Sequence, residues 1–149
     1  VIALTYSASL VVRTCLVYDF VLGNHQLNLM LNRIRNGKKT DLFDDETRQP
    51  RWVWNLANIL IRLVSSAITG ILHVAGPVSL SRWQPGRALF IYCGIAPQYI
   101  TRRVHSSSAD FHRPPDCTMS LARFQHLVSI PLLTIGESAN QQAKAIQLQ

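Results

Sequence analysis

The stretch Leu10–Tyr18, which reads LVVRTCLVY, constrains the fold more than any other part of this 149-residue chain. It is rich in β-branched residues and almost continuously apolar around Arg13. Such a run is typical of a strand that is buried on both faces, and strands of this kind occur in parallel sheets covered by helices. We therefore expect further strands beside it and helices over its faces.

Helices and further strands are predicted along the chain in the order of an α/β protein. Apolar residues recur at helical spacing over Gln26–Asn36, which Gly37 ends, and over Val53–Ala67, which Gly70 ends. Ile71–Val74 is a second short apolar run of the strand type. Because parallel strands need neighbours on their free edges, the sequence predicts part of a larger α/β fold. It also predicts self-association through exposed strand edges.

The C-terminal part of the chain is more polar. Ser81 is placed to cap a helix over Arg82–Cys93, and Ser120 is placed to cap another over Leu121–Val128. The intervening residues 102–113 are predicted to form a loop.

The length of 149 residues suits about one domain. Hydrophobic residues make up 48% of the chain, which excludes a disordered segment and leaves enough apolar material for a core. We expect the domain to occupy residues 1–135. Residues 136–149 form a polar tail that is expected to fray or to project into solvent.

The charge balance points to an anionic partner. Fifteen Lys and Arg residues stand against eight Asp and Glu residues, and twelve of the fifteen are Arg. The planar guanidinium of Arg matches phosphate and carboxylate better than the ammonium of Lys does. The basic pair Arg102-Arg103, with His105, lacks accompanying aromatic residues. We therefore expect a small anionic molecule as partner and no nucleic acid.

The three cysteines, Cys15, Cys93 and Cys117, are widely spaced in apolar surroundings. No C-x-x-C motif and no pair of His at zinc spacing is present, so we expect neither a disulfide framework nor a bound metal. Reduced and mostly buried thiols are typical of a cytoplasmic protein. Val1–Leu10 lacks the basic region of a signal peptide, and polar residues interrupt Val53–Ala75, so no membrane span is expected.

Four segments carry motifs in a fixed order. Together they resemble the C-terminal half of the extended short-chain dehydrogenase/reductases, and the branch they are most similar to is the dTDP-4-dehydrorhamnose reductase (RmlD-like substrate-binding) group. The resemblance implies an extended Rossmann-type fold and hydride transfer between NAD(P) and the carbonyl of a nucleotide-sugar. The segments are LVVRTCLVYDF (10–20), LFDDETRQPRWVWNLANIL (42–60), GILHVAGPVSLSRWQPGRAL (70–89) and RPPDCTMSLARFQHL (113–127).

Two elements of that family are absent from these 149 residues. No G-x-x-G-x-x-G dinucleotide-binding fingerprint occurs. Tyr6 is followed at position 10 by Leu rather than by the Lys of the family's Tyr-x-x-x-Lys acid, and in the family that pair would lie upstream of Val1. We therefore expect the C-terminal part of an extended Rossmann-type fold without its dinucleotide-binding half. Such a chain has no catalytic residues of its own and binds no NAD(P) alone.

Two arginines in stiff turns are candidates for binding the phosphates of the substrate. Arg48 precedes a predicted helix, and Arg113 precedes Pro114-Pro115. The resemblance implies that both face the nucleotide-sugar, where a guanidinium binds two oxygens. The alternative for each is a local ion pair. Arg48 would then pair with Asp44, Asp45 or Glu46, and Arg113 with Asp110 or Asp116.

Three further residues complete the predicted substrate site. Arg82 opens a helix, where its charge opposes the macrodipole, so a phosphate, an Asp side chain or solvent is expected to compensate it locally. Tyr18 ends a strand at the edge where α/β sheets hold ligands, although packing in the core is the competing interpretation. The resemblance implies that Asn24 contacts sugar or phosphate, whereas capping the following helix is the simpler role.

These observations leave three functions open. The first is the substrate-binding portion of an NAD(P)-dependent nucleotide-sugar reductase that is inactive alone. The second is a non-catalytic regulatory module of the same fold, similar to the regulatory beta subunit of methionine adenosyltransferase. The third is a degenerate gene product without a function. A glycine fingerprint and a Tyr-x-x-x-Lys pair encoded upstream would favour the first.

Overall fold

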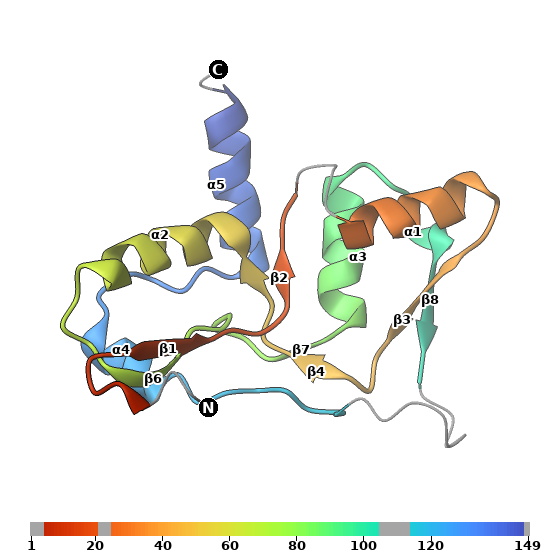
Figure 1. The fold of residues 1–149 in the computed structure, drawn as a ribbon. Coiled ribbons are helices and arrows are strands. Elements are labelled where there is room, and N and C mark those ends of the chain that lie inside the picture. The colour runs from red at the N-terminus through yellow and green to blue at the C-terminus, as the bar shows by residue number, and fades with distance from the viewer. Residues whose placement is uncertain (1–4, 21–24, 105–113, 148–149) are drawn as a thin grey trace.

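The computed structural model describes residues 5–20, 25–104 and 114–147. Strands and helices alternate along the described chain, which confirms the predicted α/β class (Figure 1). In chain order the elements are β1 (Leu10–Arg13), β2 (Val17–Tyr18), α1 (His25–Arg35), β3 (Thr40–Phe43), β4 (Thr47–Arg48), β5 (Arg51–Trp52), α2 (Val53–Val64), β6 (Gly70–His73), β7 (Leu80–Ser81), α3 (Trp83–Tyr92), the 3-10 helix η2 (Pro97–Tyr99), β8 (Ile100–Arg103), α4 (Ala122–Leu127) and α5 (Ile135–Gln147).

Within the described residues the strands pair two by two. β1 is parallel to β6, β2 to β5 and β3 to β8, whereas β4 and β7 are antiparallel. The predicted strand Leu10–Tyr18 is therefore two strands, and the pairing of Leu10 with Gly70 confirms the expected parallel arrangement. The expectation that this run is buried on both faces is wrong for β1. Its first three residues are only half-buried, because β6 alone flanks it in the described part of the chain.

The larger apolar core lies between α2 and the β1–β6 pair. Leu56, Ile59 and Leu63 recur on one face of α2 and pack with Leu72 of β6 and Phe124 of α4. Each such side chain contributes about 1.5–3 kcal/mol when it leaves water. None of the described helices has both the length and the apolar character that crossing a bilayer requires.

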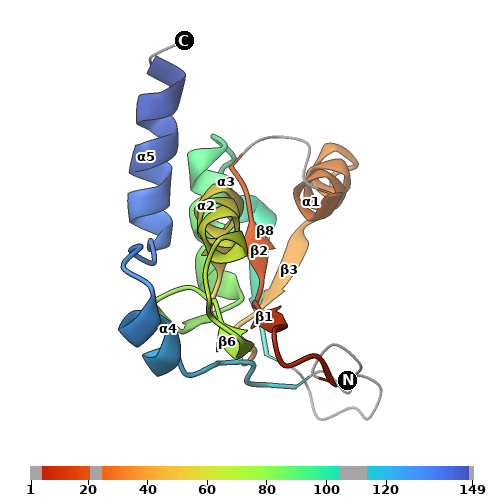
Figure 2. The same ribbon diagram turned by 60° about the vertical axis from the view of Figure 1, so that its left-hand side comes forward.

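A second core joins the middle of the chain to its C-terminal helix. Tyr18, Phe20 and Trp52 are buried here, and Ile135 and Ala139 of α5 pack against them. The predicted polar tail thus begins as an anchored helix. Its later turns extend away from the rest of the chain in both views (Figures 1 and 2).

Both predicted serine caps are wrong. Ser81 lies in β7 and donates its hydroxyl to Asp44 at 2.7 Å, while α3 begins after Arg82 without a side-chain cap. α4 begins after Leu121, also without a side-chain cap, so Ser120 does not cap it. In the first case the carboxylate of a distant turn competes for the hydroxyl that would otherwise bond the helix N-terminus.

The predicted loop over 102–113 begins with the end of a strand. Arg102 and Arg103 belong to β8, where they stand opposite Leu42 and Phe43 of β3. Their side chains are exposed and pair with the acids Asp44 and Asp41 respectively. Residues 105–113 lie outside the described part of the chain.

Candidate functional site

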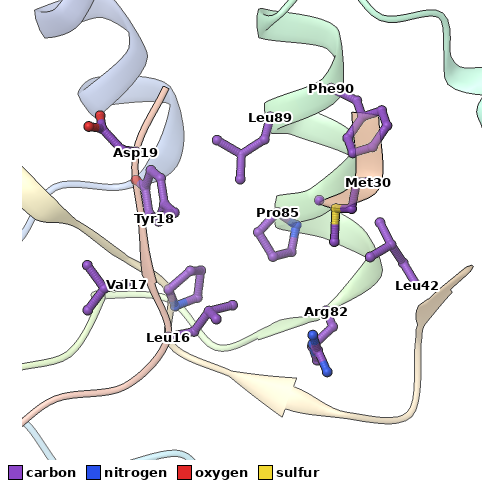
Figure 3. Close-up of a pocket in the computed structure, with 12 residues that line it drawn as sticks. Leu16, Val17, Tyr18, Asp19, Met30, Leu42, Arg82, Pro85, Leu89 and Phe90 are labelled. Atoms are coloured by element: carbon purple, nitrogen blue, oxygen red, sulfur yellow. The ribbon is translucent and has the colours of Figure 1, made fainter. Parts of the chain in front are cut away.

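A pocket opens at the carboxyl end of β2, between that strand and α3 (Figure 3). It holds about 570 Å³ of empty space, part of it open to solvent. A concave, mostly apolar surface with few polar groups is typical of small-molecule sites, and α/β proteins hold ligands beyond the carboxyl ends of their strands. Its polar side chains are Tyr18, Asp19 and Arg82; Leu16, Val17, Met30, Leu42, Pro50, Pro85, Leu89 and Phe90 supply most of the apolar lining.

One wall of this pocket depends on close packing between α3 and β3. A Cβ atom added at Gly86 would lie 2.3 Å from Cδ1 of Leu42, so the Leu42 side chain would have to shift to admit it. Pro85 precedes it in the first turn of α3, where the backbone N–H has no partner within the helix to lose. The Pro85-Gly86 pair is therefore compatible with the helix and brings it close to the strand.

A buried charge cluster, formed by Arg48, Glu46 and Arg82, borders the pocket. The Glu46 side chain is 2% exposed, and its Oε2 lies 3.1 Å from Nη2 of Arg48 and 3.1 Å from Nη1 of Arg82. Two guanidiniums and one carboxylate leave this cluster with one net positive charge. Because Arg82 also lines the pocket, that excess charge lies at its edge (Figure 3).

The two arginines of the cluster have different surroundings. Arg48 donates Nη1 to the Thr47 carbonyl at 2.7 Å and Nη2 to the Pro114 carbonyl at 3.0 Å. Its hydrogen-bonding capacity is thus directed at the protein, which is the local alternative that the sequence left open. Arg82 pairs with Glu46 but also borders the empty space of the pocket.

Tyr18 lines the pocket and also belongs to the second core. Its ring packs edge-to-face on Phe20, with ring centroids 5.5 Å apart, and the residue is 4% exposed. Burial raises the pKa of Tyr18, while the Ser138 hydroxyl and the Arg51 guanidinium act in the opposite direction. Tyr18 therefore lines the pocket and packs in the core at the same time, and its contact with a substrate stays a prediction.

Arg51 was not predicted from the sequence as a site residue. It is fully buried and donates Nη1 to the Ala75 carbonyl at 3.4 Å, and within the described residues Nε and Nη2 have no hydrogen-bond partner. Burial lowers its pKa to about 10, and the neighbouring Tyr18 opposes that change. The only sequence signal was an Arg between Pro50 and Trp52 in an otherwise apolar stretch.

Asp19 adds a carboxylate to the pocket lining, but its oxygens face elsewhere. Oδ1 accepts the Phe20 backbone N–H at 2.8 Å and the Trp52 indole N–H at 3.4 Å. In Figure 3 the Asp19 carboxylate points away from α3, which forms the opposite side of the pocket. The pocket lining therefore contains the Arg82 guanidinium and, pointing away from α3, the Asp19 carboxylate.

The structure brings together three of the five predicted substrate-binding residues. Tyr18 and Arg82 line the pocket, and Arg48 joins them through Glu46. Asn24 and Arg113 lie outside the described residues. In the described part of the chain, no group of three or more His, Cys, Asp or Glu side chains has the arrangement of a metal site.

Comparison with known proteins identifies the family of this chain. Residues 1–147 match the family described as RmlD substrate binding domain. The chain belongs to this family. The dTDP-4-dehydrorhamnose reductase of Mycobacterium tuberculosis is 37% identical to it over 105 residues, which are 70% of this chain and 34% of that protein.

Solved structures agree with the family and confirm the predicted Rossmann-type fold. The dTDP-4-dehydrorhamnose reductase of Clostridium acetobutylicum has a TM-score of 0.72 at 16% identity, covering 93% of this chain and 49% of that one. The Bacillus anthracis reductase in complex with NADP has a TM-score of 0.63 at 17% identity, covering 94% and 48%. The RmlD-family chain described here thus spans about half the length of its solved relatives and about a third of the Mycobacterium protein.

The described residues of this RmlD-family chain do not fit a dinucleotide. Pyrophosphate is bound where a glycine-rich turn leads from a strand into a helix N-terminus. α2 begins directly after Trp52 and α3 after Arg82, with no glycine in either turn. Neither of these two turns therefore has the glycine-rich arrangement that binds a pyrophosphate.

Proposed function

We propose that this chain is the substrate-binding portion of an NAD(P)-dependent nucleotide-sugar reductase, and that the pocket between β2 and α3 receives the nucleotide-sugar. Membership of the RmlD substrate binding domain family supports the reaction class, as does the name of the Mycobacterium relative. The observation that carries the proposal is an apolar pocket at a strand's carboxyl end with the Arg82 guanidinium at its edge.

The chemistry of the lining suits a nucleoside diphosphate joined to a sugar. Aliphatic side chains and Tyr18 offer flat and apolar contacts for a base or a sugar ring. A diphosphate placed against Arg82 would receive charge-assisted hydrogen bonds from a guanidinium that Glu46 already holds in position. Glu46 cannot cancel both arginines, so an anion is attracted to the cluster.

The five proposed substrate residues then take different roles. Arg82 binds the diphosphate and Tyr18 packs against the ligand. Arg48 is a positioning residue, because it orients Glu46 and holds the Pro114 carbonyl. For Asn24 and Arg113, contact with the ligand is supported by the family resemblance of their motifs.

Hydride transfer is proposed to need residues beyond these 149. The sequence holds neither a glycine fingerprint nor a Tyr-x-x-x-Lys pair, so we propose that the chain alone neither binds NADPH nor reduces a sugar carbonyl. The same absence supports a second candidate function, a non-catalytic regulatory module that binds an anionic ligand in the same pocket.

Calorimetric titration with dTDP tests the pocket directly. Arg82→Ala should weaken dTDP binding by about 10- to 100-fold, since each charge-assisted hydrogen bond contributes roughly 1.5–3 kcal/mol. Arg62→Ala is the matched control, because it removes the same charge from an exposed position of α2 that is not in the pocket lining. Equal affinities for the two variants would place the ligand elsewhere.

A titration with NADPH, followed by fluorescence, tests the cofactor part of the proposal. We expect no saturable signal with the chain alone, whether or not dTDP is present. Saturable micromolar binding would refute that part and would leave the pocket assignment to be judged by the dTDP titration.

A further inference from the structure

Two cysteines that are 102 residues apart in the sequence line one open cavity, which includes Arg48 of the charge cluster and shares Leu16 with the proposed substrate pocket. Cys15 lies between β1 and β2, and Cys117 lies in the extended segment before α4. Sγ of Cys15 is 3.8 Å from the backbone carbonyl oxygen of Cys117. Both thiols are free and partly exposed. This contact brings the Cys15 thiol against the backbone of Cys117.

The backbone of one segment holds both cysteines in place. The Gln49 N–H donates to Sγ of Cys15 at 3.4 Å. The Cys117 N–H donates to the Thr47 carbonyl at 3.1 Å, and the Thr47 N–H donates to the Pro115 carbonyl at 2.6 Å. Residues 47–49 therefore fix the positions of residues 15 and 117 relative to each other. A disulfide requires this kind of preset geometry, because two cysteines bridge without strain only when their Cα atoms lie within about 7 Å.

We propose that Cys15 and Cys117 form an oxidisable dithiol site, which a low-molecular-weight disulfide such as glutathione disulfide converts to an intramolecular disulfide. One protein thiolate attacks the glutathione disulfide, forms a mixed disulfide and releases one glutathione thiolate. The second protein thiolate attacks the sulfur of that protein cysteine and displaces the other glutathione. Two protein thiols are oxidised, and one glutathione disulfide is reduced to two glutathione molecules that carry the two protons. The cavity gives the reagent access.

The third cysteine provides an internal control. Sγ of Cys93 contacts the carbonyl of Phe20, a residue of the second core, at 3.9 Å. Burial raises the pKa of the Cys93 thiol, which lowers its thiolate fraction. Cys93 is not in the lining of the cavity that Cys15 and Cys117 share. The dithiol site requires only the positions of these two thiols, so its oxidation does not depend on nucleotide-sugar binding.

The test is oxidation of the folded chain with glutathione disulfide, followed by alkylation with iodoacetamide, non-reducing proteolysis and mass spectrometry. We expect the number of free thiols, counted in denaturant after oxidation, to fall from three to one. The expected product is one crosslinked peptide pair that contains residues 15 and 117, with Cys93 alkylated. Cys93→Ser should form the same crosslink.

Three comparisons make the outcome decisive. Cys15→Ser and Cys117→Ser should each lose the crosslink and carry glutathione on the remaining cavity thiol. Oxidation of the wild-type chain in guanidinium chloride should yield mixed pairings that include Cys93, since only the fold brings the two thiols together. Separate glutathionylation of Cys15 and Cys117 without a crosslink, or a crosslink from Cys93 in the folded chain, would overturn the proposal.

Discussion

Replacement of Glu46 by Gln tests the charge cluster on which the proposed site depends. The substitution keeps the shape of the side chain but removes the charge that both guanidiniums contact at 3.1 Å. Removal of one partner from a buried ion pair costs about 3–5 kcal/mol. The side chains of Arg48 and Arg82 are 12% and 18% exposed, so water reaches both of them. In the variant Arg48 still has its two carbonyl acceptors. We therefore expect the lower end of that range, about 3 kcal/mol.

Urea denaturation measures this loss. With a slope of about 2 kcal/mol per M, a cost of about 3 kcal/mol moves the unfolding midpoint down by about 1.5 M. Asp41→Asn is the matched control, because it also removes one carboxylate but from the exposed pair with Arg103. That pair is expected to contribute no more than about 1 kcal/mol. If both variants shift the midpoint equally, the carboxylate of Glu46 contributes no more than an exposed one, and it does not lie buried between two guanidiniums.

A double-mutant comparison separates the ion pairs from other effects of the substitution. In a chain that already carries Arg48→Met and Arg82→Met, Glu46→Gln no longer removes a partner from either guanidinium. Its cost in free energy of unfolding should then fall well below the cost in the wild-type background. An unchanged cost would mean that Glu46 acts through packing alone.

Three further outcomes follow from individual residues. Arg51→Met should raise the free energy of unfolding by about 1–3 kcal/mol, because it removes a buried cation with unpartnered donors; a lower urea midpoint would contradict this. Gly76→Ala should prevent cooperative unfolding or lower the midpoint strongly, since the new Cβ would lie 2.0 Å from the Pro50 carbonyl oxygen. The Ser81 hydroxyl and then Arg102 lower the pKa of Asp44 from 3.8, so its contribution to stability is present above about pH 4 and is lost as pH falls further. In Ser81→Ala the free energy of unfolding should therefore fall less steeply as the pH drops below about 4. An unchanged fall would show that a group other than Asp44 controls it.

The sequence alone determined the features that depend on local patterns. The apolar periodicity from Leu56 to Leu63 predicted α2 correctly. Side chains at this spacing lie on one face of a helix, and this depends only on helix geometry and not on what the helix packs against. Gly37, with φ near +70°, follows the end of α1 as predicted, whereas α2 already ends at Val64 and Gly70 begins β6 instead of ending the helix. The order of the four motifs was sufficient for the family, because it requires only residue types and spacing.

Tertiary structure alone decided which polar groups meet. Ser81 bonds Asp44 instead of a helix end, and Glu46 pairs with Arg82, because antiparallel pairing of β4 with β7 places these distant residues side by side. Arg51 is buried because it forms β5 beside β2, a contact that no periodicity encodes. Long-range strand pairing sets such contacts, and a single sequence carries no signal for which strands will pair. The sequence could therefore propose arginines for an anion site, but only the fold decided that Arg82 borders the pocket and that Arg48 is directed at the protein.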